Sequence, residues 1–130
     1  MFCRLKEVTL VFDFGNANES QRKAIATSDG PVLITAGPGT GKTFTLVQRT
    51  IYLIEECGIK PESIFIATFT EKAAKELITR ITDELAKRKI TANINEMYVG
   101  TFHSLFEMQP YKSRMVTLFR KSQRKGCYIL

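Results

Sequence analysis

The sequence predicts an α/β fold with a mostly parallel sheet, and two observations support that prediction. Short apolar runs bounded by turn residues alternate with longer segments whose apolar residues recur at helical spacing, a pattern typical of β-α-β units. The 130 residues are 44% hydrophobic and 25% charged, which is close to the globular average and excludes collagen-like, disordered and low-complexity chains. One domain is expected at this length, and no apolar run is long enough to span a membrane.

Turn residues and apolar spacing define the elements of the first half of the chain. In chain order they are an extended run at 8–14, a short helix from Asn18 or Ser20 to Ala26, a strand at 31–35 and a helix at 42–56. The run 31–35 (PVLIT) is short and apolar, which is typical of a strand buried on both faces. Three glycines and a proline at 36–41 indicate a loop between this strand and the next helix.

The second half continues the alternation of strands and helices. In chain order it predicts a strand at 63–68, a helix from Glu71 to about Lys89, a strand at 97–101 and a short helix at 102–108. Thr70 precedes the long helix and can cap it, and the apolar residues of that helix fall on one stripe. Beyond Pro110 no clean period remains, so we divide the chain into a body, 1–109, and a basic tail, 110–130.

The formal net charge of +6 lies entirely in the tail. Residues 1–109 hold 13 basic and 13 acidic side chains, whereas residues 110–130 hold six basic side chains and no acid. A basic surface attracts nucleic acids and anionic membranes, but that argument applies here to the tail and says little about the body. The three cysteines are widely spaced without a CxxC pair, so we expect reduced thiols in a cytoplasmic protein without a signal peptide.

The stretch Ala36-Gly-Pro-Gly-Thr-Gly-Lys-Thr43 predicts a phosphate-binding loop. Glycines let backbone N–H groups turn toward an anion and approach it closely, and the N-terminus of the following helix adds partial positive charge. Lys42 supplies a full charge to the β- and γ-phosphates, and the Thr43 hydroxyl can bind Mg²⁺. Ala36 stands where the strict pattern has glycine, but three glycines remain. The alternative is a glycine-rich turn followed by an unrelated Lys-Thr pair.

Four motifs in the same order resemble those of the UvrD/Rep/PcrA-like superfamily 1 DNA helicases. They are Asn18-Glu-Ser-Gln21 with Ala24-Ile25, the loop at 36–43, ATFTEKAA at 67–74 and GTFHS at 100–104. They look like the family's adenine-reading glutamine motif, its P-loop, motif Ia and motif Ib. Together they cover about residues 11–107, and their joint occurrence is highly specific. The body is therefore similar to the N-terminal part of the family's ATP-binding domain.

The resemblance implies a RecA-like P-loop NTPase, a three-layer sandwich with a mostly parallel sheet that is incomplete here. It implies that ATP and Mg²⁺ contact Gln21, which would hydrogen-bond the adenine edge, and the residues Ala36, Gly37, Pro38, Gly39, Thr40, Gly41, Lys42, Thr43 and Phe44. Among these, Lys42 and Thr43 would be catalytic and Thr43 would bind Mg²⁺. Phe44 stands where many members carry an arginine.

The resemblance also implies that single-stranded DNA contacts motifs Ia and Ib. The residues concerned are Thr68, Phe69, Thr70, Thr101 and His103. Phe69 would stack on a base, a contact that tolerates any base sequence. Ordinary structural alternatives exist, because Gln21 can be an exposed helix residue, Phe69 can be a core residue and His103 can have a structural role.

Parts of the family's catalytic machinery are absent from these 130 residues. Phosphoryl transfer requires an acidic pair for Mg²⁺ and water, and arginine fingers for the transition state, yet Glu107 is the only acid after Ser104. We therefore expect no catalytic activity from this chain alone. The alternatives are a non-catalytic remnant that binds nucleotide weakly or not at all, and a P-loop phosphotransferase, which motifs Ia and Ib disfavour.

The basic tail suggests a truncated or frame-shifted gene, or an artificially made sequence, a hypothesis that sequencing beyond codon 130 would test. Missing strands would leave apolar sheet faces and edges exposed, so self-association is expected. The ending Cys127-Tyr-Ile-Leu130 fits a prenylation motif. Lipidation at Cys127 is not expected, because the body resembles bacterial-type helicases.

Overall fold

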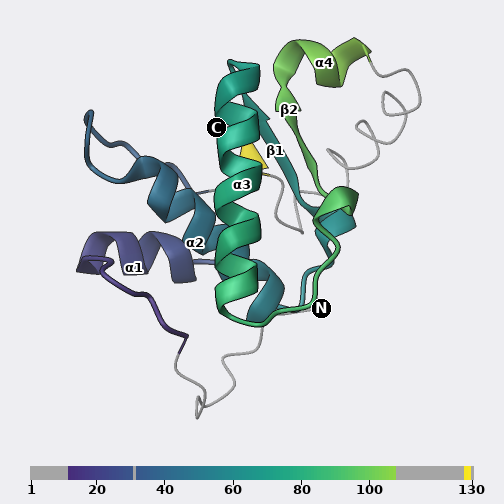
Figure 1. The fold of residues 1–130 in the computed structure, drawn as a ribbon. Coiled ribbons are helices and arrows are strands. Elements are labelled where there is room, and N and C mark those ends of the chain that lie inside the picture. The colour runs from purple at the N-terminus through teal and green to yellow at the C-terminus, as the bar shows by residue number, and fades with distance from the viewer. Residues whose placement is uncertain (1–11, 31, 108–127, 130) are drawn as a thin grey trace.

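The computed structural model describes residues 12–30, 32–107 and 128–129, which form an α/β arrangement with a parallel sheet (Figure 1). The strands are β1 (Phe65–Thr68), β2 (Tyr98–Thr101) and β3 (Tyr128–Ile129), in the order β2-β1-β3. Both pairings are parallel, and Thr68 of β1 lies opposite Thr101 of β2. The predicted α/β class with a parallel sheet is confirmed.

The helices begin and end within two residues of the predicted positions. They are α1 (Glu19–Ala26), α2 (Lys42–Glu55), α3 (Glu71–Lys87) and α4 (Phe102–Glu107), with short 3-10 turns at Pro61–Ser63 and Ile94–Glu96. At the start of α1 the Asn18 side chain accepts from the Gln21 N–H, and the Gln21 side chain accepts from the Asn18 N–H. At the start of α3 the Thr70 side chain accepts from the Ala73 N–H. These side-chain caps satisfy N–H groups that have no partner inside the helix.

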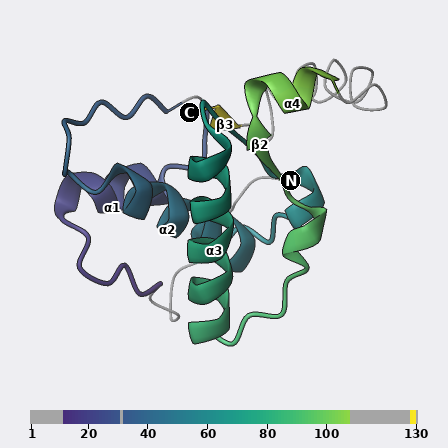
Figure 2. The ribbon, with the colours of Figure 1, turned by 45° about the horizontal axis from the view of Figure 1, so that its top comes forward.

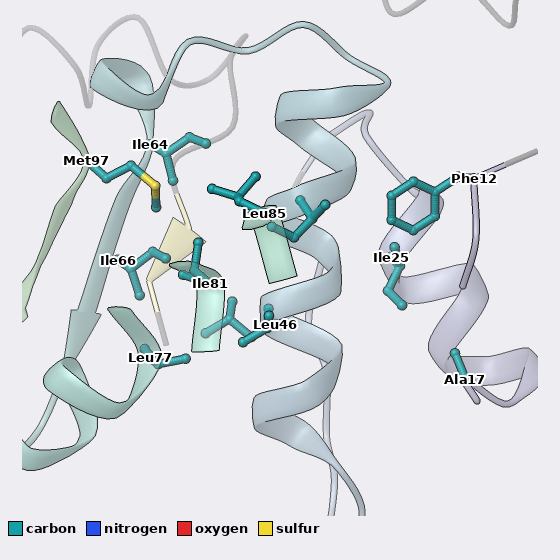
Figure 3. Close-up of a cluster of buried hydrophobic side chains, with 12 residues drawn as sticks. Phe12, Ala17, Ile25, Leu46, Ile64, Ile66, Leu77, Ile81, Leu85 and Met97 are labelled. Atoms are coloured by element: carbon teal, nitrogen blue, oxygen red, sulfur yellow. The ribbon is translucent and has the colours of Figure 1, made fainter. Parts of the chain in front are cut away.

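The main hydrophobic core lies between one face of the sheet and helices α1, α2 and α3 (Figure 3). Helix α3 contributes Leu77, Ile81 and Leu85, which are four residues apart and so share one helix face. They meet Ile66 of β1 and Ile64, the residue before that strand, with α2 and α1 on the far side. Complete burial of each such side chain stabilises the fold by about 1.5–3 kcal/mol.

The other face of the sheet carries a smaller apolar cluster. Phe65 and Ala67 alternate with Ile64 and Ile66 along the chain, so they point to the opposite face. Both are buried, and Tyr98 and Phe102 pack against them. Phe102 therefore belongs to this cluster, although it lies at the start of α4.

The prediction of a strand at 31–35 is wrong. Residues 32–35 have no regular secondary structure, and the Leu33 side chain is 90% exposed. In both views the blue segment that leads into α2 is an open loop (Figures 1 and 2). The physical reason is pairing, because β1 has β2 on one edge and β3 on the other, and no strand in the described residues pairs with 32–35. Without a neighbour, an apolar run has no partner for its backbone N–H and C=O groups.

The N-terminal extended run is described only from Phe12 to Phe14, and these residues form no strand. Phe12 is buried, and its ring lies 5.0 Å from the Phe14 ring and 5.1 Å from the Tyr52 ring of α2, both in edge-on contacts. Aromatic packing against α2, and not sheet pairing, holds this part of the chain.

Arg88, the C-cap of α3, connects three parts of the chain. Its guanidinium donates to the Asp13 carbonyl, to the Gln48 side chain at 3.0 Å and to the Glu55 carboxylate at 3.2 Å. It also lies 4.3 Å from the centroid of the Phe12 ring, within the range of a cation–π contact. The N-terminal segment, α2 and α3 are therefore joined at one point.

Arg49 of α2 connects that helix to α1. Its side chain is buried, at 2% exposure, and its Nη1 donates to the carbonyls of Ala24 and Ile25, the latter at 3.5 Å. These carbonyls lie in the last turn of α1, where carbonyls have no intrahelical partner. A buried charge is thus placed against the negative end of a helix dipole.

No helix in the described part of the chain is both long and apolar enough to cross a membrane. Apart from β3, the basic tail lies outside the described residues, as does Cys127. The predicted boundary near residue 109 falls in the same gap.

Candidate nucleotide and nucleic-acid site

The glycine-rich loop is open to solvent and leads directly into α2. Residues 36–40 are exposed, and Gly39 and Gly41 have φ values of +73° and +78°. This left-handed conformation favours glycine. The Gly41 carbonyl accepts from the Thr45 N–H at 2.9 Å, the first bond of the helix, so the N–H groups of residues 42–44 lie outside the helical ladder. The local geometry suits an anion at this end of α2.

Two hydrogen bonds hold the loop in its turn. The Thr40 hydroxyl donates to the Gly37 carbonyl at 2.6 Å, and the Lys42 ammonium donates to the Ala36 carbonyl at 3.2 Å. The positive charge of Lys42 therefore lies against the loop itself. Because these residues are exposed, an incoming anion can compete for the ammonium without unpacking the core.

Gln21 brings α1 to the loop. Its Oε1 accepts from the Asn18 N–H at 2.9 Å, and its Nε2 donates to the Thr40 carbonyl at 3.1 Å. It also packs closely over Gly41, since a Cβ added there would lie 3.0 Å from Nε2. One N–H and one lone pair of the Gln21 amide are used, which leaves one of each for a further pair of hydrogen bonds.

Thr43 and Phe44 of the first turn of α2 differ in what they offer a ligand. Thr43 is exposed, and within the described residues its hydroxyl makes no hydrogen bond. A free hydroxyl oxygen is a suitable ligand for Mg²⁺. Phe44 is half-buried against the main core, so its ring serves packing. The described residues hold no cluster of three or more His, Cys, Asp or Glu suited to a metal.

The ends of β1 and β2 bring motifs Ia and Ib together. Thr68 is 7% exposed, and its hydroxyl donates to the Thr70 carbonyl at 2.9 Å and lies 3.4 Å from the Gly100 carbonyl. Its hydroxyl is thus used to join the two strand ends. Phe69, the next residue, is 87% exposed, so it is not a core residue, and Thr70 is exposed as well.

In motif Ib, Thr101 has a structural position and His103 an exposed one. The Thr101 hydroxyl accepts from the Ser104 N–H at 3.1 Å at the start of α4. The His103 side chain is 86% exposed, and its Nε2 lies 3.2 Å from the Glu107 carboxylate. Of the five predicted DNA contacts, Phe69, Thr70 and His103 are the ones that face solvent.

Sequence reasoning missed Phe102, whose ring centroid lies 5.6 Å from that of Phe69. A signal for it exists in the sequence, because β1 and β2 both end in threonine followed by phenylalanine. In a parallel pair of matched register, equivalent positions lie side by side. The hydrogen bond between Gln21 and the loop was not predicted either.

Comparison with known proteins bears directly on this site. Residues 17–112 match the family described as the UvrD/REP helicase N-terminal domain. The putative ATP-dependent DNA helicase YjcD of Bacillus subtilis is 38% identical over 105 residues, which is 81% of this chain and 14% of YjcD. The ATP-dependent DNA helicase Rep of Buchnera aphidicola is 46% identical over 88 residues, which is 68% of this chain and 13% of Rep.

The ATP-dependent DNA helicase PcrA of Staphylococcus epidermidis is 39% identical over 90 residues, which is 69% of this chain and 12% of PcrA. The chain therefore spans a small part of the length of each of these relatives. The matched range includes Gln21, the glycine-rich loop and both strand ends. The predicted resemblance is confirmed, and the chain belongs to the UvrD/REP helicase N-terminal domain family.

Proposed function

We propose that this chain is the ATP-binding part of an ATP-dependent superfamily 1 DNA helicase. The observation that carries the proposal is the exposed loop at 36–43, which opens α2 and has Gln21 bonded to it at 3.1 Å. Relatives named ATP-dependent DNA helicases support the use of ATP and a DNA substrate. The fold we propose is a RecA-like, three-layer P-loop NTPase, to which the described sheet and helices contribute.

For the nucleotide, we assign the phosphates to the backbone N–H groups of the loop and of the first turn of α2. Lys42 would exchange its bond to the Ala36 carbonyl for the β- and γ-phosphates, because a charged acceptor forms the stronger hydrogen bond. Thr43 would hold Mg²⁺, which neutralises phosphate charge when bound. Gln21 would use its remaining N–H and lone pair for the adenine edge.

For single-stranded DNA, we assign direct contact to Phe69, Thr70 and His103. Stacking of a base on the exposed Phe69 ring would contribute about 1–3 kcal/mol. Thr68 and Thr101 would act indirectly at the same place: the Thr68 hydroxyl supports the end of β1, and the Thr101 hydroxyl supports the start of α4.

We further propose that these 130 residues bind ATP without hydrolysing it, because they hold no acidic pair after Ser104. A second candidate, a non-catalytic remnant that binds nucleotide weakly, is favoured by one observation. The loop is fixed on its helix side, whereas residues 32–35 before it lie outside the sheet. A loop held at one end loses more conformational entropy when it closes on a ligand.

We also propose a cytoplasmic location without lipidation at Cys127, and self-association of the chain. Leu33, Phe69 and Ile78 are exposed apolar side chains, and β2 has an unpaired outer edge in the described sheet. Sedimentation at several concentrations measures the association, and a monomer at every concentration would contradict it.

A Mg-ATP binding isotherm on the full chain tests the nucleotide proposal. We expect saturable binding that Lys42→Ala weakens by about tenfold or more, since a hydrogen bond to a charged group contributes about 1.5–3 kcal/mol. Lys75→Ala is the matched control, because Lys75 is an exposed lysine on α3 and its loss removes the same charge. The control should bind like the parent chain.

An ATPase assay with and without an oligonucleotide distinguishes the candidates. Saturable binding without turnover supports the proposal. Weak or absent affinity for Mg-ATP favours the remnant. DNA-stimulated hydrolysis that Lys42→Ala abolishes would contradict the lack of turnover, and transfer of the phosphoryl group to a small molecule would identify a phosphotransferase.

A further inference from the structure

We infer that Phe102 positions the Phe69 ring for base stacking, an inference that rests on the proposed binding of single-stranded DNA. The two rings lie 5.6 Å apart, centroid to centroid, and are inclined by 51°. Aromatic pairs attract one another at centroid separations of about 4.5–7 Å in tilted or edge-on arrangements. The contact is therefore a stabilising one.

The fold itself creates the juxtaposition. Strands β1 and β2 are parallel, and their register pairs Thr68 with Thr101. The residue after each of these threonines is a phenylalanine, so Phe69 and Phe102 directly follow the ends of two neighbouring strands. Helix α4 begins directly at the end of β2, beside the end of β1 (Figure 1). The parallel pairing of β1 and β2 sets the spacing between the strand ends, and the Thr68 hydroxyl lies 3.4 Å from the Gly100 carbonyl.

The two rings have different surroundings, which gives each a different role. Phe69 is 87% exposed, so nothing but a neighbouring side chain can orient its ring. Phe102 is half-buried and packs against Phe65 and Ala67. The Phe102 ring thus contacts buried residues of β1 and also contacts the Phe69 ring. Through Phe102, the exposed ring is packed against the sheet.

Such a contact would raise affinity by ordering Phe69 before DNA arrives. A freely rotating side chain loses rotamer entropy when it stacks on a base, and a pre-oriented one loses less. Because the rings are tilted, the contact does not cover both faces of Phe69, and a face stays available to a base. Phe102 is accordingly a positioning residue and not itself a DNA contact.

The experiment measures binding of the full chain to a labelled oligothymidylate and to an abasic strand of equal length. Phe102→Leu keeps an apolar side chain against Phe65 but removes the ring. We expect it to lower affinity for the oligothymidylate about threefold to tenfold, the effect of ordering one further side chain on binding, with little change for the abasic strand. Phe69→Ala should lower affinity further, and adding Phe102→Leu to it should have no additional effect.

Two controls separate positioning from general destabilisation. Phe102→Tyr retains the ring and should retain affinity. Tyr98→Leu removes a ring from the same cluster, 6.4 Å from Phe65, and should leave base-dependent binding unchanged. If Phe102→Leu does not fold by circular dichroism, Phe102→Met takes its place.

The outcomes discriminate between this inference and the proposed function. Normal affinity of Phe102→Leu, an equal loss for both strands, or independent effects of the Phe69 and Phe102 substitutions would overturn the positioning role while DNA binding stands. Failure of the parent chain to bind either strand would overturn DNA binding and the positioning role together, with the Mg-ATP isotherm unaffected.

Discussion

Two segments of this chain share one sequence pattern and differ in structure. In residues 32–55 and in residues 65–87, a short apolar run is followed by a loop and then a long helix. The run 65–68 is a buried strand, whereas the run 32–35 is irregular and is exposed from Leu33 onward. Both helices form. The difference teaches that a helix is specified locally, while a strand exists only where a neighbour pairs with it.

The largest expected effect comes from truncating each apolar run in turn. Ile66→Ala removes a side chain that is 1% exposed between the sheet and α3 and should lower the free energy of unfolding by about 2–5 kcal/mol. Leu33→Ala removes a side chain that is 90% exposed and should change the free energy of unfolding by less than about 0.5 kcal/mol. Urea unfolding measures both. Comparable losses would mean that residues 32–35 are packed in solution.

A smaller effect should come from the glycine that begins α2. Gly41 and Gly58 have φ values of +78° and +62°, so alanine at either costs about 1–2 kcal/mol of strain. Gly58 has nothing within 4 Å of the added Cβ, whereas at Gly41 the Gln21 amide lies 3.0 Å away. The Gln21 amide must then shift by a few tenths of an ångström, which strains its hydrogen bond to the Thr40 carbonyl and adds a loss of up to about 1.5 kcal/mol.

Gly41→Ala should therefore destabilise the chain more than Gly58→Ala, as thermal unfolding would measure. It should also weaken Mg-ATP binding, which Gly58→Ala should leave intact. Equal destabilisation by the two substitutions would show that the contact between Gln21 and the loop contributes nothing to the fold.

The smallest effect concerns Glu84, which links the two segments. Its carboxylate accepts from Lys87 at 2.8 Å in α3 and from Gln48 at 3.2 Å in α2. The Lys87 hydrogen bond, with that from Gln48, lowers the pKa of Glu84 below 4.5 despite partial burial. The stabilisation by the charged Glu84 side chain is present at pH values above the ordinary pKa of glutamate and is lost as the pH falls through the lower pKa of the folded state.

Glu84→Gln should therefore lower the free energy of unfolding by less than about 1 kcal/mol at neutral pH, and this difference should vanish in acid. Urea unfolding curves of both chains across the acid range measure the difference. Glu76→Gln is the control, since Glu76 pairs with Arg80 within α3 and carries the same charge. A cost that persists in acid would mean that the carboxylate acts by packing and not by charge.

Most of the elements could be predicted because their signals are local. Helix α2 begins at Lys42 after Gly41, and α3 begins after the cap Thr70. Strands β1 and β2 were predictable as apolar runs, and in the structure they pair with each other. The run at 31–35 had the same local signal. Its failure to pair depends on which strands neighbour one another in the assembled sheet, and a short stretch of sequence does not carry that information.

The candidate site shows the same limit. The loop before α2 was predictable from its glycines and proline, and the exposure of Phe69 agrees with the surface position expected for it. The contacts of Gln21 with Thr40 and of Phe102 with Phe69 join residues 19 and 33 positions apart. Such contacts depend on how elements dock, so sequence reasoning named Gln21, Thr40 and Phe69 but missed Phe102 and both contacts.

The buried guanidinium of Arg49 has a consequence for how the molecule opens. With eight residues, α1 is shorter than the roughly 12–15 residues at which an isolated helix becomes even marginally stable in water. Contacts with the rest of the fold support it: Ile25 is buried in the main core, and Arg49 of α2 binds the last carbonyls of α1. Local unfolding of α2 is therefore expected to unfold α1 as well, in a single cooperative event. The hydrogen bond between Gln21 and the Thr40 carbonyl of the loop would be lost at the same time.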